Sequence, residues 1–387
     1  MTDLSERIPL AELRDLLAVG QPLPFRILDA QGRLLLNAGH LLADEAQFES
    51  LMERGAWAER PLVEAERTAR ADAAGRSKAS HAASLFDQWD RTLWQLDKLT
   101  RALVRRQAVV GNVITFVRSL RTIVEADPDV ALFLCVRQDD RRFALYPLTH
   151  SLHCATIALL AGHQLGWSEA QSDSLACAAL TMNLSILELQ AIMAEQGEPP
   201  SAKQLRDIRA HPDAAVALLR ACGVADEMWL TAVAEHHERS GGDGYPQGLD
   251  RISESAVVLR AIDVFMARIS PRAKRPAMAP QAAVRQLFQE SAGSPLTMAL
   301  VKTLGVHPPG SMLQLRSGEI AVSIRRPPRG TQPIAATLSD ARGRPIAETH
   351  RRDTAQAEFA VAGPLSDGTQ FARVLPERVY GVIAGTT

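Results

Sequence analysis

The spacing of apolar side chains divides the chain into a short mixed module, a long helical region and a strand-rich tail. Two apolar runs flank a polar turn in "PFRILDAQGRLLLNAG", which is typical of a β-hairpin. The stretch "ADEAQFESLMERG" that follows predicts a helix, with Gly55 as its C-terminal stop. We therefore expect residues 1–65 to form a small N-terminal α/β module.

A polar, alanine-rich stretch follows this module. Residues 66–83 contain almost no large apolar side chain, which is typical of a linker or of a helix without a packed face. Residues 84–127 have apolar positions at helical spacing and predict two connector helices. We expect Trp89 and Trp94, on the first of these helices, to be packing residues.

Apolar stripes at helical spacing recur from residue 128 to about residue 305, and no alternating run there is long enough to predict a sheet. After His307 the chain has short β-type runs around glycine-containing turns. The predicted fold is therefore mainly α. It comprises a helical domain over residues 128–325 and a β-rich C-terminal appendage over residues 326–387.

Composition narrows the class of protein. The 387 residues carry a formal net charge of −1, which gives no bulk attraction to nucleic acid or to an anionic membrane. The most apolar window, "SLACAALTMNLSILELQAIM", is interrupted by polar residues and predicts a buried helix, and we expect no membrane span.

The four cysteines form no CxxC pair and are expected to be reduced, buried thiols. With no signal-peptide pattern at the N-terminus, we expect a cytoplasmic protein.

The histidines are the first candidates for chemistry. His211 precedes Pro212 at a predicted helix start, and His236 and His237 close another predicted helix. Imidazole is a common metal ligand, and a helical domain can aim several such side chains at one point. A single histidine on an apolar helix is more often a hydrogen-bonded core residue. The adjacent pair, followed by an acid and a glycine turn, favours a metal site more strongly.

The stretch "HHERSGGDGYPQGL" resembles the signature of the HD-GYP family, the helical cyclic di-GMP phosphodiesterases of the HD superfamily. The family pattern is His-His-Glu-x-x-Asp-Gly-x-Gly-Tyr-Pro. Here Gly241 stands in place of the aspartate. The matching positions are His236, His237, Glu238, Gly242, Gly244, Tyr245 and Pro246.

The resemblance covers about residues 128–325 and implies a set of metal ligands. The segment "THSLHCATIALLAGHQLGWSEAQ" is similar to the first helical segment of the family and supplies His150. "RAHPDAAVALLRACG" and "ESAVVLRAIDVFMARISPRAKR" resemble the segments that supply His211 and Asp263. By this resemblance, His211 and the adjacent histidine pair would hold one metal ion. His150 and Asp263 would belong to a second.

The central motif of the superfamily is replaced. The family has Leu-His-Asp-Ile-Gly-Lys, where this chain has Met182 for the histidine, Asn183 for the aspartate and Ile186 for the lysine. In the family the aspartate bridges two metal ions, and a neutral amide cannot offset two dications. A thioether suits iron, manganese or magnesium poorly, and an aliphatic side chain cannot donate to a phosphate. We therefore expect no full two-metal centre and assign no catalytic residue.

Two interpretations of the retained residues stay open. His211, His236 and His237 with water suit a single transition metal ion such as iron or manganese. In the other interpretation these residues, with His150 and Asp263, make ordinary hydrogen bonds in a buried polar pocket.

The resemblance also implies contacts to a ligand. Arg272 and Arg275 correspond to the basic pair that binds the dinucleotide phosphates in the family, and a solvated helix end is the alternative. Gly244 and Tyr245 lie in the loop that borders the family's active site, and Tyr245 could instead contact a partner protein. The glycines could equally serve only to turn the chain between two helices.

Three functions are weighed. The first is a catalytically impaired module of cyclic di-GMP signalling that binds this or another cyclic dinucleotide, or docks on a partner signalling protein through the Tyr245 loop. The second is a metal-dependent phosphodiesterase with a rearranged or one-metal site. The third is an interaction scaffold without a ligand.

Overall fold

The computed structural model describes residues 6–14, 16–17, 23–40, 42, 44–68, 85–137, 143–291, 293–327, 329–365 and 376–380. The chain divides into two compact units, Met1–Ala82 and Ala83–Thr387. Most of the predicted linker lies outside the described residues. Its first residues, 66–68, continue a helix that begins at residue 60.

The first unit is the expected α/β module. Its antiparallel sheet has the order β1-β4-β2-β3, with β1 (Arg7–Pro9), β2 (Ile27–Leu28), β3 (Leu34–Leu36) and β4 (Trp57–Glu59). The predicted hairpin is the β2–β3 pair. Helix α1 (Glu45–Glu53) begins where the Asp44 side chain accepts the N–H of Gln47, and the chain then turns at Gly55, whose φ is +65°.

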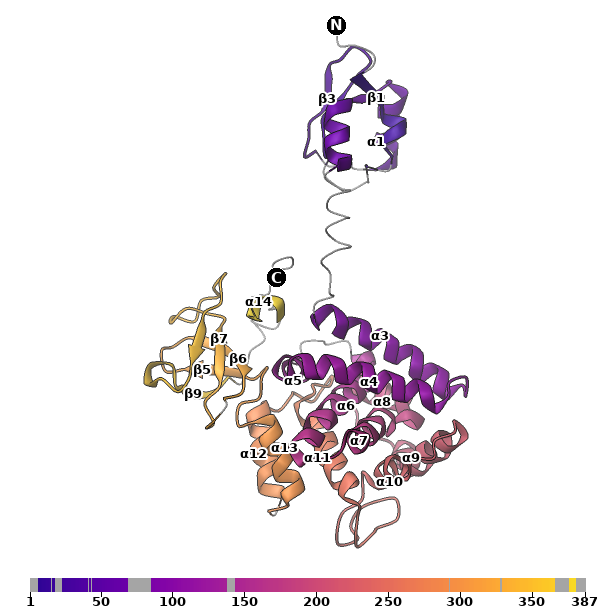
Figure 1. The fold of residues 1–387 in the computed structure, drawn as a ribbon, viewed down its shortest axis with the longest axis vertical. Coiled ribbons are helices and arrows are strands. Elements are labelled where there is room, and N and C mark those ends of the chain that lie inside the picture. The colour runs from indigo at the N-terminus through magenta and orange to yellow at the C-terminus, as the bar shows by residue number, and fades with distance from the viewer. Residues whose placement is uncertain are drawn as a thin grey trace. The chain divides into compact units, whose positions relative to one another are not determined.

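The second unit is mainly helical and carries the candidate site. Its elements are α3 (Leu85–Val104), α4 (Val110–Ala126), α5 (Pro128–Val136), α6 (Tyr146–Leu165), α7 (Glu169–Thr181), α8 (Leu187–Glu195), α9 (Ala202–Ala221), α10 (Glu227–Glu235), α11 (Glu254–Ile269), α12 (Pro280–Glu290) and α13 (Pro295–Leu304). Helix α6 is buried over most of its circumference, as expected of a central helix. It packs against α7, α11 and α13 (Figure 1).

Three expectations about these helices were wrong. His211, expected at a helix start, lies inside α9, because the helix continues through Pro212. The apolar window predicted as one helix is interrupted after Thr181, where a turn and the short 3₁₀ helix η4 (Leu184–Ile186) separate α7 from α8. Trp89 packs in the core, but Trp94 is 68% exposed. Five residues advance a helix by about 140° beyond one turn, so the two rings lie on different faces.

Two helical stretches are long and apolar enough to cross a membrane, Phe143–Leu165 and Glu169–Glu195. In the structure 72% and 56% of their apolar windows are buried inside the domain. Core packing therefore accounts for most of this apolar surface, and the stretches are weak evidence for a span.

The C-terminal sheet has the order β8-β7-β6-β5-β9 and is antiparallel in all its pairs. Its strands are β5 (Met312–Leu315), β6 (Ile320–Arg325), β7 (Ile334–Thr337), β8 (Arg351–Asp353) and β9 (Val361–Pro364), and the short α14 (Pro376–Tyr380) follows. The boundary predicted after residue 325 falls between two paired strands, β6 and β7. The sheet therefore begins earlier than the predicted appendage.

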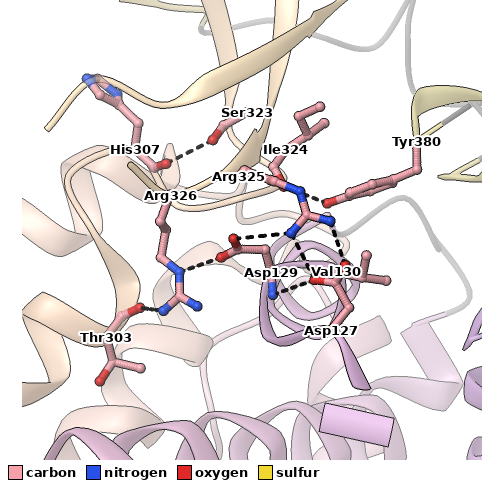
Figure 2. A network of polar contacts seen from close by, with 10 residues as sticks. All are labelled: Asp127, Asp129, Val130, Thr303, His307, Ser323, Ile324, Arg325, Arg326 and Tyr380. Atoms are coloured by element: carbon pink, nitrogen blue, oxygen red, sulfur yellow. Dashed lines mark hydrogen bonds and ion pairs between the residues drawn. The ribbon is translucent and has the colours of Figure 1, made fainter. Parts of the chain in front are cut away.

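Charged side chains fix this sheet to the start of α5 (Figure 2). Asp127 caps α5 and also accepts a hydrogen bond of 2.7 Å from Arg325. Arg326 donates to Asp129 and, at 2.6 Å, to the carbonyl of Thr303. We call Asp127, Asp129, Arg325 and Arg326 the arginine–aspartate contact.

Candidate metal and ligand site

The orientation of His211 follows from the proline beside it. Pro212 has no N–H, so the carbonyl of Ile208, four residues earlier in α9, loses its helical partner. His211 Nδ1 lies 2.5 Å from this oxygen. Because a carbonyl only accepts hydrogen bonds, Nδ1 carries the proton and Nε2 keeps its lone pair.

His236 is oriented in a similar way by a helix end. It directly follows α10, where the last carbonyls have no partner within the helix. The carbonyl of Val233 accepts a hydrogen bond of 2.7 Å from His236 Nδ1. The Nε2 atom of this fully buried ring is therefore also a bare acceptor.

The Nε2 atoms of His211 and His236 lie 3.1 Å apart, with lone pair facing lone pair. A cation between the two atoms would satisfy both lone pairs. A proton does not fill this role at neutral pH, because burial and the neighbouring His236 lower the pKa of His211 to about 3. Burial also lowers the pKa of His236.

A metal ion suits this geometry. Two imidazole nitrogens bound at 2.0–2.1 Å to one ion lie about 3 Å apart. His237 completes the set, and the ligand atoms of the three residues lie within 4.8 Å of one another. Burial and His236 lower the pKa of His237 to about 2, so this imidazole is also neutral. We call His211, His236 and His237 the three-histidine group.

The loop after this group is anchored by a buried carboxylate. Glu238 is fully buried, and its two oxygens accept hydrogen bonds from successive backbone N–H groups. These hydrogen bonds hold the far end of the loop against the helix end that carries the histidine pair. The donors are Gln247 at 2.6 Å, Gly248 at 3.2 Å and Leu249 at 3.1 Å.

The two predicted loop contacts have different positions. Gly244 packs on the backbone of Glu238, where a Cβ atom would lie 2.4 Å from the Glu238 Cα, so only glycine fits. The Tyr245 ring stacks on His237, with centroids 4.6 Å apart. Tyr245 therefore borders the three-histidine group, whereas Gly244 serves the packing of the loop.

His150 and Asp263 belong to a second group. His150 Nε2 on α6 lies 2.8 Å from Asp263 Oδ1 on α11, and Cys154 Sγ lies 3.6 Å from the same nitrogen. The three ligand atoms lie within 4.8 Å of one another. Burial alone would raise the pKa of Asp263, but the hydrogen bond to His150 and the nearby histidines lower it. We call His150, Cys154 and Asp263 the mixed group.

Arg272 lies next to the mixed group. Its Nη2 donates to the hydroxyl of Tyr146 at 2.8 Å, and that hydroxyl lies 3.5 Å from His150 Nδ1. Arg272 Nε is buried and has no hydrogen-bond partner among the described residues. Arg275 is exposed, and its guanidinium donates to the carbonyl of Ala267 instead.

The segment that replaces the family motif lies beside the three-histidine group. Ser185 Oγ donates to the carbonyl of His211 at 3.0 Å. Met182 and Asn183 are buried, with exposed fractions of 0% and 3%. Ile186 lines a cavity of about 810 Å³, together with residues of α3, α6, α8 and α9. Neither group's ligands line this cavity.

The two groups are neighbours. Burial lowers the pKa values of His211, His236 and His237, and the charge of the Asp263 carboxylate partly offsets this effect by raising them.

Sequence reasoning missed Tyr146 and Cys154, although both stand four residues from His150 and so share its helix face. It also missed the half-buried Arg260, whose charge acts on His237.

A family model and known proteins match parts of this chain. A family model for the HD domain matches residues 137–295. The chain is 29% identical over 123 residues to the cyclic di-GMP phosphodiesterase PA4108 of Pseudomonas aeruginosa, covering 31% of this chain and 30% of that protein. It is 23% identical over 150 residues to the cyclic di-GMP phosphodiesterase PdeB of Borreliella burgdorferi, covering 38% and 39%.

The matches therefore span well under half the length of both relatives. Among solved structures, Bd1817, an HDG"Y"P protein from Bdellovibrio bacteriovorus, aligns with a TM-score of 0.43 at 13% identity. That alignment covers 77% of this chain and 98% of the other.

Proposed function

Because residues 137–295 form an HD domain of the HD-GYP family, we propose that this protein acts in cyclic di-GMP signalling, as a module that binds the dinucleotide and is impaired in cleaving it. Both curated relatives are cyclic di-GMP phosphodiesterases. The impairment rests on one observation. Asn183 is buried, two residues before the Ser185 that donates to the His211 carbonyl, and it stands where the family has its bridging aspartate.

The three-histidine group supports a single bound transition metal ion. Its facing Nε2 atoms need a cation, and three imidazoles leave coordination positions open. An ion held there would supply a Lewis-acidic contact for a phosphate oxygen. The chain's own contribution is to fix two of the imidazoles through backbone carbonyls, so that little reorganisation is needed on binding.

Hydrolysis by two metals requires a carboxylate that bridges the ions and a water activated between them. Asn183 offers only a neutral amide at the bridging position. Ile186 presents an aliphatic side chain to its cavity, where the family's lysine would carry a positive charge. Both substitutions weaken catalysis more than they weaken binding.

Contacts for an anionic ligand support the binding half of the proposal. Arg272 has a buried Nε with no hydrogen-bond partner among the described residues, beside the mixed group. Tyr245 presents a ring next to the three-histidine group. We place Arg275 at the outer edge of the same site, where its exposed side chain can reach a phosphate from solvent.

A second candidate function is slow hydrolysis at a rearranged site. The observation that favours it is the mixed group, which keeps His150 and Asp263 close to the three-histidine group. Docking of a partner protein through the Tyr245 loop is compatible with either function.

The deciding experiment measures binding and hydrolysis in parallel. Purified protein is incubated anaerobically with cyclic di-GMP and ferrous or manganous ion. Bound ligand is quantified by calorimetry and products by chromatography. We expect saturable binding and no more product than from the double variant His236→Ala, His237→Ala. Linear dinucleotide or GMP above that background establishes the second candidate. If neither bound ligand nor product is detected, the scaffold interpretation remains.

The arginine pair gives a separate test of ligand binding. Charge-assisted hydrogen bonds each contribute about 1.5–3 kcal/mol, so we expect the double variant Arg272→Ala, Arg275→Ala to lose at least about 100-fold in affinity. Lys274→Ala, in the same turn and 68% exposed at its side chain, is the matched control and should bind normally. Unchanged affinity in the double variant removes the arginines from the site.

A further inference from the structure

The mixed group contains a thiol for which the family pattern gives no role. We infer that His150, Cys154 and Asp263 form a zinc-type cation site in which Cys154 is a metal ligand. The inference concerns metal binding alone and holds whether or not the domain binds a dinucleotide. It also supplies the third protein ligand that sequence reasoning did not find for His150 and Asp263.

Helix geometry brings the first two ligands together. Residues four apart on an α-helix share one face, so His150 and Cys154 project from adjacent turns of α6 toward α11. Asp263 meets them from α11, and its Oδ1 lies 2.8 Å from His150 Nε2. The two helices pack directly against each other, so the three atoms are held by rigid elements of the core.

The distances are close to those of a tetrahedral zinc site. Bonds of about 2.3 Å to sulfur and 2.0–2.1 Å to nitrogen place the two ligand atoms about 3.5 Å apart. Cys154 Sγ and His150 Nε2 are 3.6 Å apart. The Nε2 and Oδ1 atoms would separate from their hydrogen-bonded 2.8 Å by about half an ångström, since oxygen and nitrogen ligands of zinc lie about 3.3 Å apart.

Ligand chemistry selects the metal. A thiolate is a soft ligand that favours zinc and disfavours magnesium and manganese, which prefer oxygen. Three protein ligands leave a fourth position for water or for a ligand atom. The three-histidine group, which has no sulfur, has no such preference. The two groups would therefore hold different ions even though they are neighbours.

Proton balance is straightforward. On binding, the Cys154 thiol releases its proton to solvent. The proton that joins His150 Nε2 to Asp263 moves to Nδ1, which faces the hydroxyl oxygen of Tyr146 at 3.5 Å. With the ring proton carried on Nδ1, Nε2 is free to bind the ion, and the thiol proton is exchanged for the metal.

The remaining cysteines provide the contrast. All four cysteines are buried thiols, and among the described residues Cys154 is the one whose sulfur belongs to a group with a histidine and a carboxylate. Cys177 lies on α7, is equally buried, and is outside both groups. Replacing Cys177 therefore tests the general effect of losing a buried thiol.

Cobalt is the probe that separates the groups, because a Co–thiolate bond gives a near-ultraviolet charge-transfer band that imidazole ligands do not. The full chain is stripped of metal and titrated anaerobically with Co²⁺, then with Zn²⁺. We expect the thiolate band in the wild type, in Cys177→Ser and in His236→Ala, and its absence in Cys154→Ser. Zinc should displace cobalt and abolish the band.

The affinity change is the second readout. Loss of a ligand should weaken zinc binding at this site by more than the roughly 10- to 100-fold that loss of a residue hydrogen-bonded to a ligand causes. A wild-type protein that binds cobalt without a thiolate band overturns the inference, and this outcome requires no variant to fold. A band that persists in a folded Cys154→Ser or Cys154→Ala protein also overturns it.

Discussion

The three-histidine group and the arginine–aspartate contact are both polar clusters inside the second unit, yet they are built in opposite ways. At the contact each donor meets an acceptor: Arg325 donates to Asp127 at 2.7 Å, and Arg326 donates to Asp129 (Figure 2). In the three-histidine group an acceptor faces an acceptor at 3.1 Å. The first cluster is satisfied by groups of the chain, whereas the second has facing lone pairs that a bound cation would satisfy.

The charge states follow the same division. The hydrogen bond to Asp127 raises the pKa of Arg325, so this cluster is charged and internally neutralised. Burial lowers the pKa values of the three histidines, so their group is neutral and electron-rich. Unpaired acceptor atoms therefore distinguish the candidate metal-binding cluster from the one that joins two elements of the fold.

The largest expected effect is loss of metal from His236→Ala. The variant should lose about one equivalent of metal, because the two facing nitrogens no longer form a pair. Metal content after purification is measured by mass spectrometry. His163→Ala, an exposed histidine outside both groups, is the control and should keep the ion. A full metal content in His236→Ala would mean that the facing nitrogens bind nothing.

Restoring the family motif should have the next largest effect. The triple variant Met182→His, Asn183→Asp, Ile186→Lys returns a carboxylate and a cation to the segment that Ser185 joins to the His211 carbonyl. We expect cyclic di-GMP hydrolysis to rise at least about tenfold, which corresponds to about 1.4 kcal/mol of barrier. Product formation is followed by chromatography. An inactive variant that binds two ions would locate the remaining defect elsewhere, with Gly241 the first position to examine.

The arginine–aspartate contact should respond in stability instead of metal content. Asp129→Asn removes one charge from a largely buried pair and should lower the unfolding free energy by about 1–3 kcal/mol. Denaturant unfolding measures this. Glu125→Gln, whose side chain is 66% exposed and 3.8 Å from Arg121, should change the unfolding free energy by less than about 0.5 kcal/mol. Loss of metal from Asp129→Asn would contradict the conclusion that the arginine–aspartate contact affects stability alone.

The smallest effect concerns pH and the C-terminal sheet. Hydrogen bonds from Arg352 lower the pKa of Glu319, on the turn before β6. The stability from this pair is therefore present above the unfolded pKa of about 4.3 and is lost as pH falls through the lower folded pKa. We expect unfolding of the wild type to change little on this account between pH 7 and 5. Below pH 4 the unfolding free energy of the wild type should fall by on the order of 1 kcal/mol more than that of Glu319→Gln.

Local patterns were enough to predict the helical domain, the N-terminal module and the helices that carry the candidate ligands. Periodicity did not reveal the break at Met182–Asn183, because apolar residues continue on both sides of Asn183 and the pattern reads as one buried run. Cys154 was expected to be a buried thiol, which is correct. Its position beside the Asp263 carboxylate depends on how α11 packs against α6. Local sequence patterns do not determine which residues of two helices face each other.

The anchored loop after the histidine pair has a consequence for regulation. Glu238 holds the loop through three backbone hydrogen bonds, and it directly follows His236 and His237. If a protein bound this loop and displaced the Glu238 anchor, the geometry of the imidazoles, and with it the affinity for an ion, would change. Thermodynamic reciprocity then requires the ion to change the affinity for that protein by the same factor. Metal supply would in this way set the strength of an interaction made at the protein's surface.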